Sequence, residues 1–411
     1  MKTYLGSCAD LVALSLAAMH VKAPAHSEFS LLAGGPAHWI QQRLGLIKPG
    51  APHLWRRVAL AVAVTWVPLL LISAAEGLAL GHRVQLPFLC DFSVHARFLV
   101  AIPLLILAEG LVEQRVMDAV KHFVHAGLVS QTDFPRFEAA MESCKALRDS
   151  VVAEAVLLAL TVMSVILTSR EFPFNFSTWR SFVSESVHLR TFTGWWYLVV
   201  GVGLFQFLAW RWLWRLLIWY RFLWLVAKLD LRLIPTHPDR SAGLGFVGDT
   251  QKVFWTVVVA CSTTFAGILA NEIVYGGVPL ENYEFPIAGF AIVVLLFFLV
   301  PLLMFTPRLI EAKEKSMKEY GALAVAHNQM FDRKWVQGDN PAGDPMLGTP
   351  EISSLADLGS AYEILAKMRA VPFDPADAIV LLLAALLPMT PLLLAIMPLD
   401  KLLELLSKIL V

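Results

Sequence analysis

The stretch PIAGFAIVVLLFFLVPLLMF at residues 286–305 decides the fold class, because none of its side chains is charged. A helix needs about 20 mostly apolar residues to cross a bilayer. Six further segments have the same character. The sequence therefore predicts an all-α, polytopic membrane protein with about seven transmembrane helices, at 58–75, 98–116, 151–168, 195–217, 253–275, 286–305 and 378–397.

The composition supports a membrane protein. The chain has 411 residues, of which 57% are hydrophobic and only 16% charged, whereas about a quarter of the residues in a soluble domain carry a charge. The net charge is zero and no basic tail occurs, so we expect membrane lipid and no nucleic acid as a partner. No two cysteines form a CxxC pair, and we predict no metal and no cofactor. The cysteines are Cys8, Cys90, Cys144 and Cys261.

Lysine and arginine set the expected orientation. With the N-terminus in the cytoplasm, 26 of the 33 lysines and arginines fall on the cytoplasmic side, as the positive-inside rule requires. Seven spans would then place the C-terminus outside. Pro388 and Pro391 interrupt the last span and leave an alternative open, in which 378–397 is re-entrant.

Several apolar helices are expected to continue past the membrane. At 1.5 Å per residue, helices of about 40–50 residues reach well beyond a bilayer, and we predict that they form a cytoplasmic helical bundle. Residues 1–50 are interpreted as an arm that is kept, not as a cleaved signal. The predicted organisation is an N-terminal arm (1–57), spans one and two (58–116), a cytoplasmic helical segment (117–150), spans three and four (151–217), a helix extension with a glycine loop (218–252), spans five and six (253–306), a second cytoplasmic segment (307–375), and span seven with an interfacial helix (376–411).

Five stretches of the chain are distinctive: SLLAGGPAHWIQQRLGLIKPG (30–50), HARFLVAIPLLILAEG (95–110), PTHPDRSAGLGFVG (235–248), SSLADLGSAYEILAKMRAVPF (353–373) and LLPMTPLLLAIMPLDKLLELLSKIL (386–410). Together they resemble an uncharacterised family of bacterial integral membrane proteins. The resemblance covers nearly the whole chain. It implies a location in the bacterial inner membrane and assigns no activity and no residue role.

The loop THPDRSAGLGFVG at 236–248 is a candidate ligand site. Glycines allow backbone amides to turn toward an anion, and an arginine can bind a phosphate. The loop lacks the Gly-Lys-Ser/Thr of a Walker A motif. A tight turn with an internal Asp–Arg network is the alternative. The candidate residues are His237, Asp239, Arg240, Gly243 and Gly245.

Acidic residues inside predicted spans suggest an ion path, because an ionisable side chain is costly in lipid unless it is sheltered. Glu109 and Glu113 lie one turn apart on span two. The alternative is that Glu109 pairs with Arg211, Arg215 or Arg115 near the cytoplasmic interface.

Span five adds a hydroxyl cluster of Ser262, Thr263 and Thr264. These hydroxyls could line the same ion path. They could instead bond a neighbouring helix or their own backbone.

Span four and its extension are rich in aromatic and basic residues. Interfacial tryptophans and cytoplasmic arginines are typical of a membrane anchor belt. We therefore expect Arg211, Arg215, Trp212 and Trp214 at the lipid interface.

Three functions follow from these features. The first is a homo-oligomeric inner-membrane channel or transport protein for a small ion or solute. The second is a membrane-anchored scaffold or sensor with a cytoplasmic ligand or partner site. The third is an enzyme on a lipid-borne substrate, with His237, Asp239 and Arg240 at the membrane surface. No nucleophile motif such as GxSxG or HExxH occurs, so nothing in the sequence requires an enzyme.

Overall fold

The computed structural model describes residues 29–43, 45–46, 53–171, 174–184, 187–337 and 350–395. This part of the chain is almost entirely helical, with one two-stranded sheet. The first 28 residues and the predicted interfacial helix near the C-terminus lie outside the described residues.

Seven helical stretches are long and apolar enough to cross a membrane, which confirms the all-α class and the number of apolar helices predicted for the chain. Several combine two or more elements joined end to end. The stretches are 54–75 (α3), 92–125 (α4, η2 and α5), 151–169 (α7), 192–227 (α8, η3 and α9), 246–274 (α10 and α11), 280–336 (η4, α12, η5, α13 and η6) and 375–393 (α15 and most of η7).

The elements follow one another in this order: α2 (Pro36–Arg43), α3 (Leu54–Ala75), η1 (Phe88–Cys90), α4 (Phe92–His95), η2 (Ala96–Ala101), α5 (Ile102–His125), α6 (Phe134–Arg148), α7 (Val151–Ser169), β1 (Ser181–Ser184), β2 (Val187–Arg190), α8 (Phe192–Trp196), η3 (Tyr197–Val202), α9 (Gly203–Ala227), α10 (Phe246–Lys252), α11 (Trp255–Val274), η4 (Leu280–Tyr283), α12 (Glu284–Leu299), η5 (Val300–Phe305), α13 (Thr306–Phe331), η6 (Asp332–Val336), α14 (Pro350–Ala366), α15 (Pro375–Leu386) and η7 (Leu387–Ala395). The elements η2, η3 and η6 are π-helical, and η1, η4, η5 and η7 are 3₁₀-helical.

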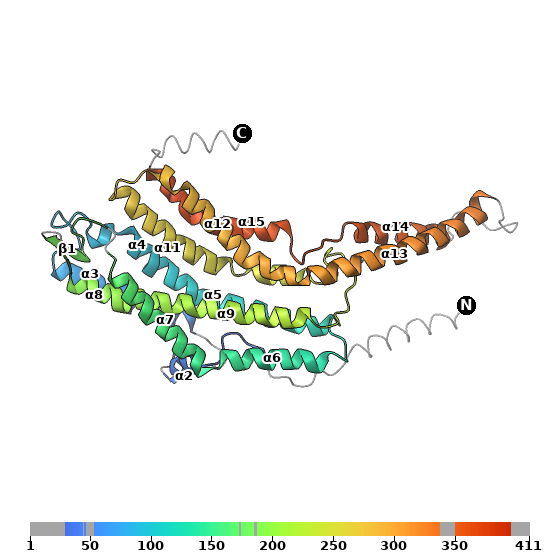
Figure 1. Cartoon of the computed structure of the whole chain (residues 1–411), viewed down its shortest axis with the longest axis horizontal. Helices are drawn as coiled ribbons and strands as arrows, with labels where there is room; N and C mark the ends of the chain where they lie inside the picture. Colours follow the sequence, from blue (N-terminus) through green and yellow to red (C-terminus); the bar gives the residue numbers. More distant parts are fainter. Residues whose placement is uncertain are drawn as a thin grey trace.

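The molecule is elongated, with α5 and α9 along its middle (Figure 1). Helix α11 packs against α5 and α15 on one side of this pair, and α6 and α7 pack against α9 on the other. The hairpin of β1 and β2 lies at one end and pairs Ser181 with Arg190. Helices α13 and α14 form a hairpin at the opposite end (Figure 1). The two ends are called the β end and the α13–α14 end below.

Proline explains two of the breaks in the apolar helices. Pro301 lies in η5, between α12 and α13, and Pro388 and Pro391 lie in η7, after α15. Each proline removes a backbone donor, so the chain tightens into 3₁₀ turns there. The predicted break in the last apolar segment is thus a change of helix type at Leu387.

The start of α15 is encoded locally. The Asp374 side chain accepts a hydrogen bond from the Ala376 N–H at 3.1 Å, and the Asp377 side chain accepts one from the Asp374 N–H at 2.8 Å. Together with Pro375 in the first turn, this is a capping box. The first turn of α15 therefore follows from its own local sequence.

Candidate functional site

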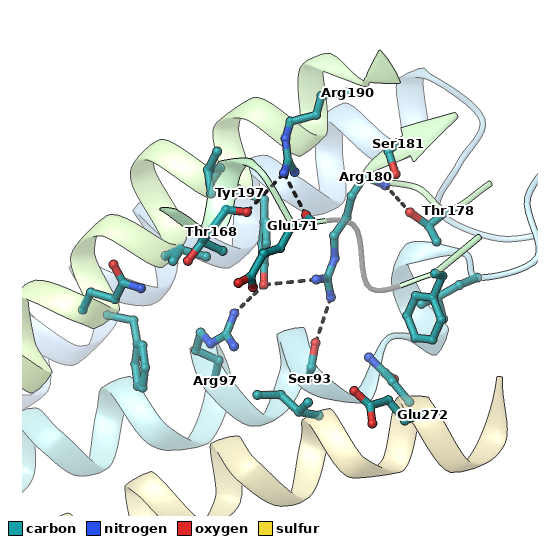
Figure 2. Close-up of a pocket in the computed structure, with 18 residues that line it drawn as sticks. Ser93, Arg97, Thr168, Glu171, Thr178, Arg180, Ser181, Arg190, Tyr197 and Glu272 are labelled. Atoms are coloured by element: carbon teal, nitrogen blue, oxygen red, sulfur yellow. Dashed lines mark hydrogen bonds between the residues drawn. The ribbon is translucent and has the colours of Figure 1, made fainter. Parts of the chain in front are cut away.

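A cavity of about 410 Å³ lies at the β end, between four of the apolar helical stretches. Its walls come from η2, from η3 and the start of α9, from the last residues of α7, and from α11 near its C-terminal end. The hairpin of β1 and β2 covers it. Three arginines line it, and Figure 2 shows them converging from different elements. They are Arg97, Arg180 and Arg190.

Two π-helical turns place Arg97 opposite Tyr197. Arg97 lies in η2 and donates a hydrogen bond to the Tyr197 hydroxyl at the start of η3. Gly201 allows the two turns to approach, because a Cβ atom there would lie 2.5 Å from the Phe98 ring. Single π-helical turns inside α-helices occur often at functional sites. The two turns lie in the helical stretches 92–125 and 192–227, and both stretches contribute side chains to the cavity.

Asp91 holds Arg180 in place. The Asp91 side chain is fully buried and pairs with the Arg180 guanidinium. It also accepts hydrogen bonds from Trp179 and Asn271, each at 2.8 Å. Burial raises the pKa of Asp91, but Arg180 and these donors outweigh it and hold the pKa at about 2. Asp91 therefore carries a negative charge that neutralises Arg180.

Arg190 lies at the end of β2 and faces a helix terminus. Its guanidinium donates to the carbonyl oxygens of Thr168, Ser169 and Glu171 at 3.3, 2.7 and 3.2 Å. These carbonyls belong to the C-terminal end of α7, where the helix dipole favours a cation. Arg190 thus ties the hairpin to α7 and closes that side of the cavity.

Arg97 has a different environment. Its guanidinium lies near the rings of Tyr197 and Phe205, at 5.8 and 5.4 Å from their centroids. Among the described residues no carboxylate forms an ion pair with it, and its buried Nε has no hydrogen-bond partner. The Nε of Arg180 and the Oε1 of Gln206 are also buried without a partner.

The cavity can therefore accept an anion. Glu171 and Glu272 also line it, and the Glu272 carboxylate accepts a hydrogen bond from the Tyr283 hydroxyl, which is a neutral donor. A carboxylate or phosphate next to Arg97 would gain charge-assisted hydrogen bonds from a planar, permanently charged donor.

The predicted ion-path residue Glu109 lies elsewhere, in a closed cluster. Glu109 pairs with Arg57 of α3 at 2.5 Å and with Arg215 of α9 at 2.9 Å. Both carboxylate oxygens are thus occupied, and each side chain is about 7% exposed. Arg211 is buried next to this group. This geometry corresponds to the ion-pair alternative, and an ion path through Glu109 stays a prediction.

Glu113 lies one turn further along α5. Its carboxylate accepts a hydrogen bond from the Leu31 N–H at 3.1 Å and so binds the segment that precedes α2. A role for Glu113 in an ion path likewise stays a prediction.

The hydroxyl cluster of α11 takes part in helix packing. Ser262 donates to the Ala385 carbonyl of α15 at 2.5 Å, and Thr264 donates to its own helix at the Ala260 carbonyl, at 3.0 Å. Thr263 is half-buried. These are the contacts expected if the cluster joins helices.

The aromatic and basic residues of α9 are more deeply buried than an interface belt requires. Trp212 is 2% exposed and donates to the Leu105 carbonyl at 2.9 Å, while Arg211 and Arg215 are 7% and 6% exposed. Trp214 is half-buried, and its Nε1 has no partner. Arg211, Trp212 and Arg215 therefore face the protein interior, which differs from the expected contact with lipid. Glu109 and the Leu105 carbonyl of α5 supply buried partners for Arg215 and Trp212, whereas the buried Nη1 of Arg211 has no hydrogen-bond partner among the described residues.

The glycine loop is folded around its own carboxylate. Asp239 accepts hydrogen bonds from the backbone N–H groups of Ser241, Gly243 and Gly245 at 2.8, 3.1 and 2.9 Å. Burial raises the pKa of Asp239, but these donors and His237 outweigh it and hold the pKa below its usual range. The amides expected to face an external anion thus bind Asp239.

The loop backbone is shaped for this contact. Arg240, Ala242 and Gly243 have positive φ values of 56°, 55° and 90°, a region that favours glycine and is strained for the other two. Gly248 allows the loop to meet the segment before α15, because a Cβ atom there would lie 2.7 Å from the Pro372 carbonyl oxygen.

A second, smaller cavity of about 260 Å³ adjoins this loop. Of the predicted residues it brings together His237, Asp239, Gly243 and Gly245, whereas Arg240 is exposed and does not line it. The rest of the lining contains three carboxylates, from Asp249, Asp374 and Asp377, together with the side chains of His122, Phe246 and Arg369. No group of side chains in the described part of the chain has the arrangement of a metal site.

No family model matches the chain, and neither a curated protein nor a solved structure matches it. The site is therefore argued from geometry alone. Sequence reasoning missed Arg97, Arg180, Arg190 and Tyr197 as site residues. The available signal was that the arginines are among the few basic residues on the side opposite to most lysines and arginines.

Proposed function

We propose that the chain is an integral membrane protein that binds a small anion, through a carboxylate or phosphate group, in the cavity at the β end. The observation that carries this proposal is the position of Arg97. It is a permanent cation at a cavity wall, and its only hydrogen-bond partner among the described residues is the Tyr197 hydroxyl.

The membrane assignment rests on the seven apolar helices. The bias of lysine and arginine then puts the β end outside the cell and the α13–α14 end in the cytoplasm. The N-terminus is cytoplasmic in this arrangement, and the membrane is the bacterial inner membrane. The cavity would face the outer leaflet and the outer solution.

The location of the cavity would strengthen binding. A charge pair in water at 4 Å is worth about 1 kcal/mol, and the same pair gains several-fold where protein and lipid exclude water. Arg97 and Tyr197 supply two donors on neighbouring helices. Because Asp91 already neutralises Arg180, we assign the main electrostatic contribution to Arg97.

Calorimetric titration of the purified protein with phosphate, glycerol 3-phosphate, succinate and acetate tests the proposal. We expect at least one of these anions to bind, and Arg97→Gln to weaken that binding by about tenfold or more. Arg170→Gln is the matched control, because Arg170 is an exposed arginine at the same end that does not line the cavity. Equal binding by Arg97→Gln and wild type, or no binding of any anion, would contradict the proposal.

Transport of the bound anion is a second candidate function, as the sequence suggested for a homo-oligomeric channel or transport protein. It is favoured by the two π-helical turns beside the cavity, since such turns occur often at functional sites. Below the cavity, however, fully buried apolar side chains fill the interior, among them Phe98, Ile102 and Leu105. A transport cycle would have to open this region.

Flux of the anion into liposomes distinguishes the two functions. Flux that Arg97→Gln abolishes would support a transporter. Binding without flux would support a sensor that responds to an outer ligand.

A further inference from the structure

The cavity has apolar walls on its deeper side. Along η3 and α9 its lining begins with Tyr197 and continues through Leu198, Val202 and Phe205. Phe205 is eight positions further along the helix than Tyr197, which corresponds to about 12 Å. From α11 the cavity receives Ile268, roughly one turn deeper than Asn271.

The polar groups gather at the other side. Arg180, Ser181 and Arg190 lie in or directly before the hairpin at the β end, and Figure 2 shows Arg180 and Arg190 above Arg97 and Ser93. Gln206 is the one polar side chain that α9 adds at depth. The three arginines thus lie toward the end of the spans, and the apolar lining from η3, α9 and α11 lies toward their middle. Leu86 and Phe174 add apolar side chains at the β end, and Glu171 and Glu272 add carboxylates there.

The apolar part reaches the surface of the apolar helices. Ile268 lines the cavity and is 37% exposed, and Phe205 is half-buried. Both α9 and α11 pack against α5, and the cavity lies between them. In the proposed membrane orientation, an apolar chain in this part of the cavity would meet the acyl chains of the outer leaflet.

From this division we infer that the ligand is an amphipathic anion, with a phosphate or carboxylate head at Arg97 and an apolar chain along Val202, Phe205 and Ile268. This inference rests on the proposed function, because it requires the anion site. It names the ligand class and the route, which is lateral entry from the outer leaflet. A soluble anion would use the arginines alone and leave the apolar walls in contact with water.

The test compares two ligands with the same head chemistry. The amphiphile is dihexanoyl phosphatidic acid, which is soluble as a monomer, and the soluble anion is glycerol 3-phosphate. We expect the amphiphile to bind about tenfold or more tightly to the detergent-solubilised protein, because burying about two methylene groups is enough for that ratio.

Variants assign the preference to the apolar walls. Ile268→Ser should reduce the preference for the amphiphile several-fold and leave the affinity for glycerol 3-phosphate unchanged. Ile292→Ser on α12 is the matched control, because Ile292 is an exposed isoleucine outside the cavity. Ile268 is partly exposed, so its substitution should leave the fold intact.

The outcomes separate the two proposals. If Arg97→Gln binds neither ligand and Ile268→Ser no longer prefers the amphiphile, the anion site and the amphipathic ligand are both supported. Equal affinity for the two ligands, with both lost in Arg97→Gln, overturns the amphiphile and keeps the anion site. No binding of either ligand to the wild-type protein overturns the anion site and the inference with it.

Discussion

The molecule contains two arginine clusters that differ in their counter-charges. At the β end, Arg97, Arg180 and Arg190 surround a cavity, and the one buried carboxylate, Asp91, is paired with Arg180. In the middle of the helices, Arg57 and Arg215 close on both oxygens of Glu109. An arginine cluster that is closed by a shared carboxylate joins helices. An arginine cluster in which one guanidinium group borders a cavity without a carboxylate partner is suited to binding an anion.

The comparison also shows why a buried acid is weak evidence for an ion path. Glu109 is the deepest acid of its span. Two guanidinium groups pair with its carboxylate and offset the free-energy cost of burying that charge in an apolar environment. Arg97 lies in the same helical stretch and has no such partner among the described residues. The group without its counter-charge is the better candidate for ligand binding.

The largest expected effect is on the closed cluster. Glu109→Gln leaves Arg57 and Arg215 buried without a counter-charge and should lower the free energy of unfolding by about 3–5 kcal/mol. Thermal unfolding in detergent measures this loss. Glu113→Gln is the control and should cost less, because Glu113 binds the Leu31 N–H and no arginine. An unchanged stability together with altered ion flux would instead assign Glu109 to an ion path.

The second effect tests whether the cavity is open. Asp91→Asn removes the partner of Arg180 and should destabilise the protein by about 3 kcal/mol. Added phosphate should restore part of this stability, because an anion can reach Arg180 through the cavity. The same addition should leave Glu109→Gln unchanged, since that cluster is closed. Equal rescue of both variants, or of neither, would break the distinction between the clusters.

The sequence predicts the helices better than the sites. Apolar runs locate all seven stretches, and Asp374 with Pro375 marks the start of α15. The cavity is assembled from residues 97, 180 and 190, which meet only after η2, the hairpin and η3 have folded together. No local pattern indicates a π-helical turn, and pairing of Arg57 with Glu109 depends on the packing of α3 against α5.

The composition of the sequence identified the glycine loop, but it did not predict which group the backbone amides of the loop bind. Three backbone amides converge there, as the glycines suggested, yet they bind Asp239 of the same loop. Composition shows that amides are available. It does not show whether an internal carboxylate or a ligand occupies them.

The smallest expected effect concerns this loop and its pH dependence. The folded pKa of Asp239 lies below its usual value, so its contribution is complete above about pH 5 and is lost as the pH falls through the lowered folded pKa. Asp239→Asn should therefore cost about 1–2 kcal/mol at neutral pH and remove the loop's own acid sensitivity. Hydrogen-exchange protection factors of the Ser241 and Gly243 amides, followed from about pH 6 down through the acid range until Asp239 is protonated, measure both effects. The Gly248 amide is the internal control, because it donates to the Pro372 carbonyl and not to Asp239. Protection of Ser241 and Gly243 that persists in acid and in Asp239→Asn would show that the loop is held by other contacts, and its amides would then be free for a ligand.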